Sequence, residues 1–282
     1  MEEGFFEGPG PRIHWQAHRV SGSRAAVAIV HGYGEHAGRY LELVQALGNG
    51  GFDCFLLDLR GHGLSEGPRG HVDRFEDYLF DLDRLVEKAR GASERLFLFG
   101  HSLGGLILLR YLQEGGEADG AIVSAPYLKL AFEPPAWKRK AATILERFFP
   151  RLPIPSGLRP EMLTRDPERR AEAEADPLYF TSTTAGWFAQ ANRAQREALA
   201  RAGAIRLPIL GLLPLADSIA DPRATEAFWA ELGSRDRELV RFEESYHEVL
   251  NEVPPLRQRA LACIRDFLAA RLDARAAEEP GI

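Results

Sequence analysis

The feature that most constrains this chain is a serine flanked by glycines at the junction of two apolar runs. Ser102 is the centre of a Gly-His-Ser-Leu-Gly sequence. The apolar run 96–99 before it is typical of a buried strand, and the run 103–109 after it is typical of a helix. A chain that passes from strand to helix across one residue must turn sharply, which small neighbours permit. We therefore expect Gly100 and Gly104 to allow a strained turn at the serine.

This strand–turn–helix context predicts a nucleophile elbow. The letters G-x-S-x-G alone occur often by chance, but a strand before them and a helix after them favour a catalytic serine. The helix would direct its first amide groups and the positive end of its dipole toward the hydroxyl of Ser102. Ser65 and Ser124 lack this context, so we reject them as nucleophiles.

A nucleophilic serine needs a base, and the base needs a carboxylate that orients it. In folds that place the nucleophile on such an elbow, the triad residues follow the chain order serine, acid, histidine. His247 is the one histidine after Ser102, and it follows the strand-like run 239–242. A lone loop histidine is usually a surface residue, but every other histidine precedes the serine and cannot fill the ordered position. We predict that His247 is the base.

The acid is expected after the strand that precedes this one. The apolar run 208–213 is followed by Asp217 and Asp221. Asp221 stands before Pro222 and a helical pattern, which is typical of a residue that caps a helix. Asp217 is left as the acid that holds His247.

Acyl transfer also needs N–H donors for the negative charge that develops on the carbonyl oxygen. One donor is expected to be the backbone amide of Leu103, the residue after the nucleophile. The other comes from the turn after the first long buried strand, which is the glycine-rich segment 31–36. The amide of Tyr33 is the predicted donor there.

The polar residues of these turns are expected to have structural roles. Glu35, His36 and Arg39 are interpreted as a network that holds the glycine-rich loop. His31 precedes the serine and lies on another strand, so we do not expect it to act in catalysis. The carboxylate and glycines of segment 58–65 are expected to fix the shape of a second loop.

Strand and helix patterns alternate through most of the chain, which predicts an α/β fold with a mostly parallel sheet between helices. Ligands bind beyond the carboxyl ends of the strands in such sheets, which is where the candidate residues fall. A final helix is expected over 255–272. The predicted buried strands are 26–30, 54–57, 96–99, 121–123 and 208–213.

Residues 127–205 interrupt this alternation, because they contain many prolines and no strong strand pattern. We expect a helical cap inserted into a core formed by 1–126 and 206–282. A disordered linker is disfavoured because the insertion is rich in aromatic residues. These are Trp137, Phe148, Phe149, Tyr179, Phe180, Trp187 and Phe188.

Composition excludes several classes. The 282 residues carry a formal net charge of −6, which disfavours a nucleic-acid partner. The chain shows no apolar run long enough to span a membrane and no signal-peptide pattern, so a cytoplasmic location is expected. Cys54 and Cys263 are expected to be free buried thiols, with a disulfide as the alternative. No spacing suggests a metal site, and no cofactor is expected.

The same segments resemble the monoacylglycerol lipase and lysophospholipase branch of the α/β-hydrolases, in order from residue 13 to residue 268. Two positions depart from that pattern: Leu213-Pro214 stands where the family usually has His-Gly, and Leu103 where it often has methionine. The segments that carry the resemblance are HGYGEHAGRY at 31–40, DLRGHGLS at 58–65, GHSLGG at 100–105, SAP at 124–126, ADSIADP at 216–222 and HEVLNE at 247–252.

The resemblance implies an α/β-hydrolase fold whose helical cap lines an acyl tunnel. It implies a triad of Ser102, Asp217 and His247, with the amides of Tyr33 and Leu103 as oxyanion donors. The expected reaction is hydrolysis of a single-chain lipid ester without a cofactor, with transient contact between the cap and a membrane or lipid surface. The oligomeric state is left open.

Several alternatives stay open beside this reading. A general short-chain carboxylesterase or thioesterase would use the same triad. A peptidase is disfavoured because the cap shows no clear acidic anchor for an amine terminus. Dehalogenase or epoxide hydrolase chemistry needs an aspartate nucleophile, and residue 102 is serine. A non-catalytic ligand-binding relative would usually lack a triad residue, and none is missing here.

Overall fold

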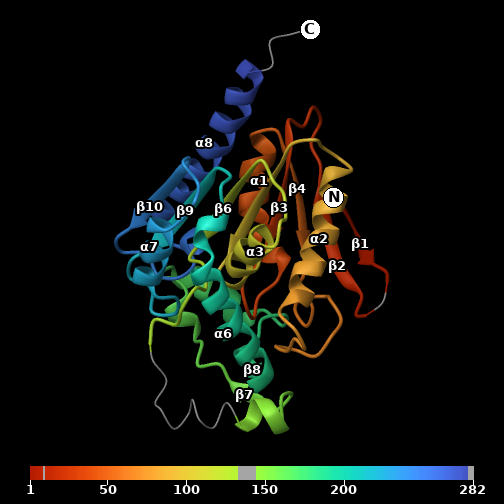
Figure 1. Ribbon diagram of the computed structural model, residues 1–282, viewed down its shortest axis with the longest axis vertical. Helices are drawn as coiled ribbons and strands as arrows, with labels where there is room; N and C mark the ends of the chain where they lie inside the picture. The colour runs from red at the N-terminus through yellow and green to blue at the C-terminus, as the bar shows by residue number, and fades with distance from the viewer. Residues whose placement is uncertain (9, 133–143, 279–282) are drawn as a thin grey trace.

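The computed structural model describes residues 1–8, 10–132 and 144–278. These residues form an eight-stranded sheet flanked by helices, with the strand order β1-β2-β4-β3-β5-β6-β9-β10 (Figure 1). The strands are β1 (Glu2–Phe6), β2 (Ile13–His18), β3 (Ala25–Val30), β4 (Phe52–Leu57), β5 (Leu96–His101), β6 (Gly120–Ser124), β9 (Ile209–Pro214) and β10 (Arg237–Phe242).

The centre of the sheet is parallel, as the alternation of strands and helices predicts. Strands β4, β3, β5, β6, β9 and β10 pair in parallel, while β1 pairs antiparallel with β2 and β2 pairs antiparallel with β4. β3, β5 and β6 are buried along their whole length, which explains their continuous apolar sequences. The antiparallel pair β1–β2 at the edge was not predicted from the sequence.

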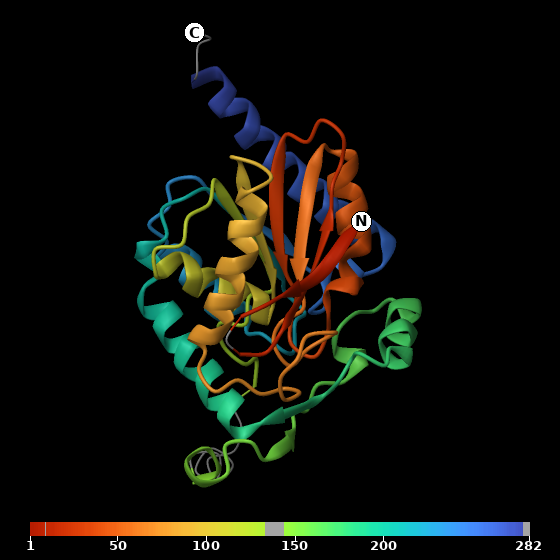
Figure 2. The same cartoon turned by 90° about the vertical axis from the view of Figure 1, so that its right-hand side faces the viewer.

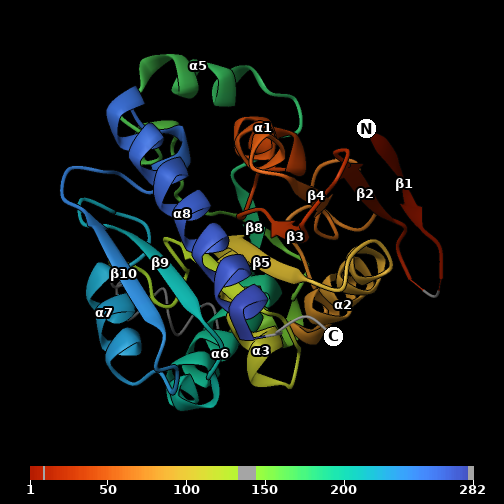
Figure 3. The same ribbon diagram turned by 90° about the horizontal axis from the view of Figure 1, so that it is seen from above.

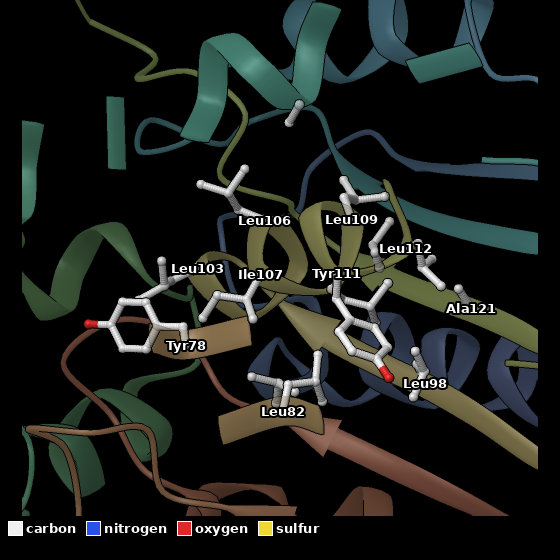
Figure 4. Packing of buried hydrophobic residues seen from close by; sticks show 14 of the residues in the cluster. Tyr78, Leu82, Leu98, Leu103, Leu106, Ile107, Leu109, Tyr111, Leu112 and Ala121 are labelled. Atoms are coloured by element: carbon white, nitrogen blue, oxygen red, sulfur yellow. The ribbon is translucent and has the colours of Figure 1, made fainter. Parts of the chain in front are cut away.

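Helices cover both faces of this sheet (Figure 3). The apolar sides of α1 and α8 belong to one buried cluster, and those of α2, α3 and α7 belong to the other. Figure 4 shows α3 in the second cluster, where Leu103 and Ile107 lie beside Tyr78 and Leu82 of α2. The helices are α1 (Leu41–Asn49), α2 (Glu76–Arg90), α3 (Leu103–Gln113), α7 (Pro222–Ala230) and α8 (Pro254–Glu278).

The expected insertion begins after β6 and ends before β9. It contains α5 (Pro167–Ala175) and α6 (Ala185–Ala200), and residues 144–148 are also helical. It also contains a small antiparallel pair that was not predicted, β7 (Pro153–Pro155) with β8 (Ser182–Thr184). Figure 2 shows the pair β7–β8 below the end of the sheet, while α6 rises from it along one side of the core. Trp137, one of the aromatic residues on which the cap prediction depends, lies outside the described residues.

Short 3-10 helices complete the connections, and one of them follows the glycine-rich loop. They are η1 (Ala37–Tyr40), η2 (Pro160–Met162), η3 (Ala202–Ala204) and η4 (Val249–Asn251). The final helix α8 continues beyond the expected end at 272, to Glu278. Cys54 and Cys263 are both free, but Cys263 is only partly buried, which corrects the expectation that both thiols are buried.

Candidate active site

The turn at Ser102 is strained in the way that the sequence predicts. Ser102 has a φ of +50°, a conformation that residues other than glycine rarely adopt. A Cβ atom at Gly100 would lie 2.5 Å from the carbonyl oxygen of Gly104, and one at Gly104 would overlap the carbonyl oxygen of Val30. Both positions therefore require glycine, and the serine sits between β5 and the first residue of α3.

The structure brings Ser102, His247 and Asp217 into one hydrogen-bonded chain. His247 Nε2 lies 2.8 Å from Ser102 Oγ, and His247 Nδ1 lies 2.6 Å from Asp217 Oδ2. When Nδ1–H donates to the carboxylate, Nε2 is free to accept the serine proton. All three side chains are buried at the carboxyl ends of strands. This arrangement can activate a serine for attack on a carbonyl carbon.

The loop after β9 fixes the carboxylate of Asp217. Its Oδ1 accepts hydrogen bonds from the amides of Ile219 at 2.7 Å and Ala220 at 3.1 Å, which leaves Oδ2 for the histidine. Asp221 instead caps α7 by accepting from the amide of Arg223 at 3.0 Å. The departure at Leu213-Pro214 does not displace the aspartate, because Pro214 still pairs with the end of β10.

A second histidine packs against the first. The rings of His101 and His247 lie 4.9 Å apart, and both are buried. Burial and the nearby charge of His247 lower the pKa of His101 to about 4. Burial also lowers the pKa of His247, but the carboxylate of Asp217 outweighs this and leaves it raised above the ordinary value. Near neutral pH, His101 is therefore an uncharged neighbour of His247.

The loop that carries His247 is held by a buried ion pair that sequence reasoning did not identify. Glu248 accepts from both terminal nitrogens of Arg39, at 2.8 and 2.9 Å. Burial raises the pKa of Glu248, but Arg39 outweighs it and lowers that pKa to about 2. Arg39 also donates to Glu35 at 3.1 Å. The signal in the sequence that could have marked Glu248 is its position directly after the predicted base, His247.

The predicted oxyanion donors lie beside the serine. Tyr33 and Leu103 line the same cavity as Ser102. Leu103 is the first residue of α3, so its N–H has no partner within the helix. In the glycine-rich loop the amide of Gly32 donates to Glu35 at 2.6 Å, which confirms that Glu35 holds this loop. The amide of Tyr33, which follows Gly32 in the chain, is the predicted oxyanion donor.

The other polar turn residues make the structural contacts that the sequence predicts. His31 accepts from the amide of Leu59 at 2.9 Å, which joins the glycine-rich loop to segment 58–65. Asp58 accepts from the amides of Ala37 at 2.8 Å and Leu64 at 2.9 Å, so it joins two loops. The hydroxyl of Ser65 donates to the backbone carbonyl of Asp58 at 2.6 Å and accepts from the amide of His14 at 2.8 Å.

An apolar cavity of about 380 Å³ lies over Ser102. Segments on both sides of β6 contribute to its walls, and Ser102 and His247 are among the polar residues that line it. The apolar lining includes Tyr127, Leu130, Ile154, Leu158, Leu163, Trp187, Phe188 and Ile219. This volume and lining are suited to an apolar chain whose reactive carbonyl lies at Ser102.

Within the described ranges, no group of three or more His, Cys, Asp or Glu side chains could hold a metal ion. A search of the helices in the same ranges found none long and apolar enough to cross a membrane.

Comparisons with known proteins show the family to which this chain belongs. Residues 21–254 match the family described as serine aminopeptidase, S33. Phospholipase YtpA of Bacillus subtilis is 28% identical over 256 residues, which cover 90% of this chain and 97% of that protein. Monoacylglycerol lipase of Mycolicibacterium smegmatis is 30% identical over 233 residues, covering 81% of this chain and 83% of the relative.

Solved structures give the same result. The crystal structure of Paleococcus ferrophilus monoacylglycerol lipase superposes with a TM-score of 0.85 at 30% identity, covering 92% of this chain and 99% of that one. The fold and the site define a serine hydrolase with the α/β-hydrolase fold. The chain belongs to the serine aminopeptidase S33 family of these hydrolases and is homologous to monoacylglycerol lipases.

Proposed function

We propose that this protein hydrolyses single-chain lipid esters, of the monoacylglycerol or lysophospholipid type, through an acyl-enzyme. The observation that carries this proposal is the hydrogen-bonded chain of Ser102, His247 and Asp217, whose serine and histidine line a largely apolar cavity. Such a cavity suits one hydrocarbon chain with its ester carbonyl at the serine. Relatives whose names describe monoacylglycerol lipases support the same substrate class.

In the proposed mechanism, Ser102 Oγ attacks the ester carbonyl while His247 Nε2 takes its proton. Asp217 holds the imidazole and stabilises its charged form, and the amides of Tyr33 and Leu103 stabilise the oxyanion. The alcohol leaves with the proton from His247. Water then attacks the acyl-enzyme by the same route and releases the fatty acid.

We also propose that residues 127–205 act as a cap that selects the acyl chain, and that the core comprises 1–126 and 206–282. Ile154, Leu158 and Trp187 of this insertion line the cavity over Ser102. Other apolar side chains of the same segment face solvent, and we propose that they contact a membrane or lipid surface while the protein works in the cytoplasm. The exposed ones are Phe132, Ile144, Phe148, Phe149, Leu152 and Leu199.

Peptidase activity, which the family description raises, is less well supported by the site. An aminopeptidase needs a free carboxylate for the substrate's amino group. Among the described residues, the carboxylates that line the cavity are Glu35 and Glu248, and both are paired with Arg39. A short-chain carboxylesterase or thioesterase would use the same site, but the apolar lining and the volume of about 380 Å³ favour a longer chain.

The test is a release assay across p-nitrophenyl esters, monoacylglycerols and lysophosphatidyl lipids of varied chain length, with amino-acid p-nitroanilides as a peptidase control. We expect kcat/KM to fall when the acyl chain is shortened to two carbons. A rise on shortening would contradict the lipid-ester proposal while leaving a short-chain esterase. Labelling by a fluorophosphonate probe, lost in Ser102→Ala, separates an enzyme from a ligand-binding relative.

A further inference from the structure

The side chain of Tyr33 ties the oxyanion loop to the insertion. Its hydroxyl donates to the backbone carbonyl of Ser182, in β8, at 2.7 Å, and the carbonyl of Gly70 is a weaker acceptor at 3.4 Å. The backbone of the neighbouring residue makes a second tie, because the carbonyl of Gly34 accepts from the amide of Phe180 at 2.9 Å. Two hydrogen bonds thus join consecutive residues of the oxyanion loop to the segment that leads into α6.

A third segment of chain, which contains Gly70, packs closely against this hydroxyl. Gly70 has a φ of +63°, and a Cβ atom there would overlap the Tyr33 hydroxyl and lie 2.7 Å from the carbonyl oxygen of Ser182. Gly34, at φ +77°, is equally confined, because a Cβ atom there would overlap the carbonyl oxygen of Phe180. Glycines at both positions let three segments meet around one phenol.

Aromatic packing holds the Tyr33 ring in the same position. The ring lies 4.1 Å from that of Trp187 in α6 and 5.6 Å from that of Phe180, between centroids. It also meets the ring of His62 edge-on at 5.3 Å. Trp187 and Phe180 belong to the insertion, whereas His62 belongs to the core, so the phenol ring stands between the two.

We propose that the Tyr33 hydroxyl is a positioning group that makes the oxyanion donor of this enzyme depend on the seating of the insertion. The inference rests on the proposed function, in which the amide of the same residue stabilises the oxyanion. A donor is effective only when it is held at the place where the charge develops. The hydrogen bond to Ser182 holds the hydroxyl of Tyr33 in place. The backbone amide of the same residue is the proposed oxyanion donor.

The first test is Tyr33→Phe, which keeps the ring and the backbone amide and removes only the hydroxyl. We expect kcat/KM for p-nitrophenyl acetate to fall about fivefold, the scale expected when one neutral hydrogen bond is lost. This substrate reports on the serine site even if the natural substrate is not a lipid ester. The affinity of a trifluoromethyl ketone, which forms a tetrahedral oxyanion with the serine, should weaken by a similar factor.

The matched control is Tyr179→Phe. Tyr179 lies on the same segment, and its hydroxyl makes no hydrogen bond with the described residues, so this variant should keep wild-type kinetics. Activities are divided by the concentration of serine sites titrated with a fluorophosphonate. A variant that folds less completely therefore does not appear less active per site. A long-chain p-nitrophenyl ester should show the same fold-loss as the acetate, because the effect is at the carbonyl.

A second variant tests the same bond without removing the hydroxyl. Gly70→Ala would push the phenol away from Ser182, so it should lower kcat/KM in the same direction. In the Gly70→Ala background, Tyr33→Phe should then have little further effect. Unchanged kcat/KM per titrated site in Tyr33→Phe, or a loss confined to long acyl chains, would overturn the proposal. A protein that does not label at all would instead refute the serine hydrolase mechanism.

Discussion

Arg39 and Glu248 form a two-point ion pair directly beside His247, with nitrogen–oxygen distances of 2.8 and 2.9 Å. Both side chains are at most 10% exposed. The pair joins η1, which follows the glycine-rich loop 31–36, to the turn that carries the predicted base. Two parts of the candidate site that are far apart in the sequence are therefore held together by one buried contact.

Removing one partner of this pair should destabilise the fold strongly. Arg39→Met leaves Glu248 buried without its counter-charge, and such changes cost about 3–5 kcal/mol of unfolding free energy. The control is Arg241→Met, which breaks an ion pair with Glu226 in which both side chains are more than 40% exposed and should cost less than about 1 kcal/mol. Equal losses in urea unfolding at pH 7 would contradict the structural role of the pair.

The pH dependence of that loss has a definite sign. With Arg39 present, the pKa of Glu248 is lowered to about 2, so its contribution to stability is present above the unfolded value near 4.5 and is lost as pH falls toward 2. In Arg39→Met the raising effect of burial, which is the largest, is opposed only by the smaller lowering effects of His101 and Asn251, so we expect the pKa to lie above that unfolded value. The variant should therefore lose stability as pH rises, and the difference from wild type should be larger at pH 7 than at pH 5.

Activity should fall on the acid side as His247 gains a proton. Its pKa is raised above 6.5, chiefly by Asp217 against the lowering effect of burial, so the midpoint in kcat/KM should lie above that value. Glu248 also raises this pKa, so Glu248→Gln should move the midpoint to lower pH. Glu226→Gln, an exposed control, should leave it in place. A profile that stays flat to about pH 5 would exclude a histidine base.

Much of this fold and site could be predicted from the sequence because the relevant signals are local. Continuous apolar runs identify β3, β5 and β6, since strands buried on both faces need no polar residues. The glycines around Ser102 and the chain order of the triad are also local or ordered signals. By contrast, the edge strand β1 begins with two glutamates and is largely exposed, so no hydrophobic pattern marks it.

What could not be predicted depends on contacts between distant segments. Arg39 meets Glu248 across 209 positions of sequence, and the Tyr33 hydroxyl meets Ser182 across 149. Neither pair has a motif of its own, because the partners are brought together by the order of strands in the sheet and by the path of the insertion. The sequence predicts that Glu35 and Arg39 hold a loop, but not that Arg39 reaches the turn after β10.

The exposed aromatic residues of the insertion should govern contact with lipid. Phe148 and Phe149 are 64% and 62% exposed, which is unfavourable in water unless a surface covers them. The double variant Phe148→Ser and Phe149→Ser should reduce co-sedimentation with phosphatidylcholine vesicles while hydrolysis of p-nitrophenyl acetate is unchanged. Phe80→Ser is the control, since Phe80 is 51% exposed but lies on α2. Equal effects of the two changes would argue against a lipid-facing insertion.

The nucleophile assignment predicts a large loss without unfolding. Ser102→Ala removes a hydroxyl from a turn that the surrounding glycines and α3 still hold, so the melting temperature should change little. Ester hydrolysis should fall by about 10⁴ to 10⁶ in kcat, the scale seen when a serine hydrolase loses its nucleophile. Activity above a tenth of wild type would mean that another residue carries the reaction.

The choice between two carboxylates is the sharpest test of the acid. Asp217 accepts two backbone amides on one oxygen and His247 on the other, whereas Asp221 caps α7 and lies 3.4 Å from Lys129. Asp217→Asn should lower kcat by about 10⁴, because the amide no longer holds the imidazole in the tautomer that accepts the serine proton. Asp221→Asn should keep nearly full activity, since asparagine caps helices about as well as aspartate. The reverse pattern in a side-by-side assay would move the acid to Asp221. Equal and small losses would leave His247 without an essential carboxylate and would contradict the triad itself.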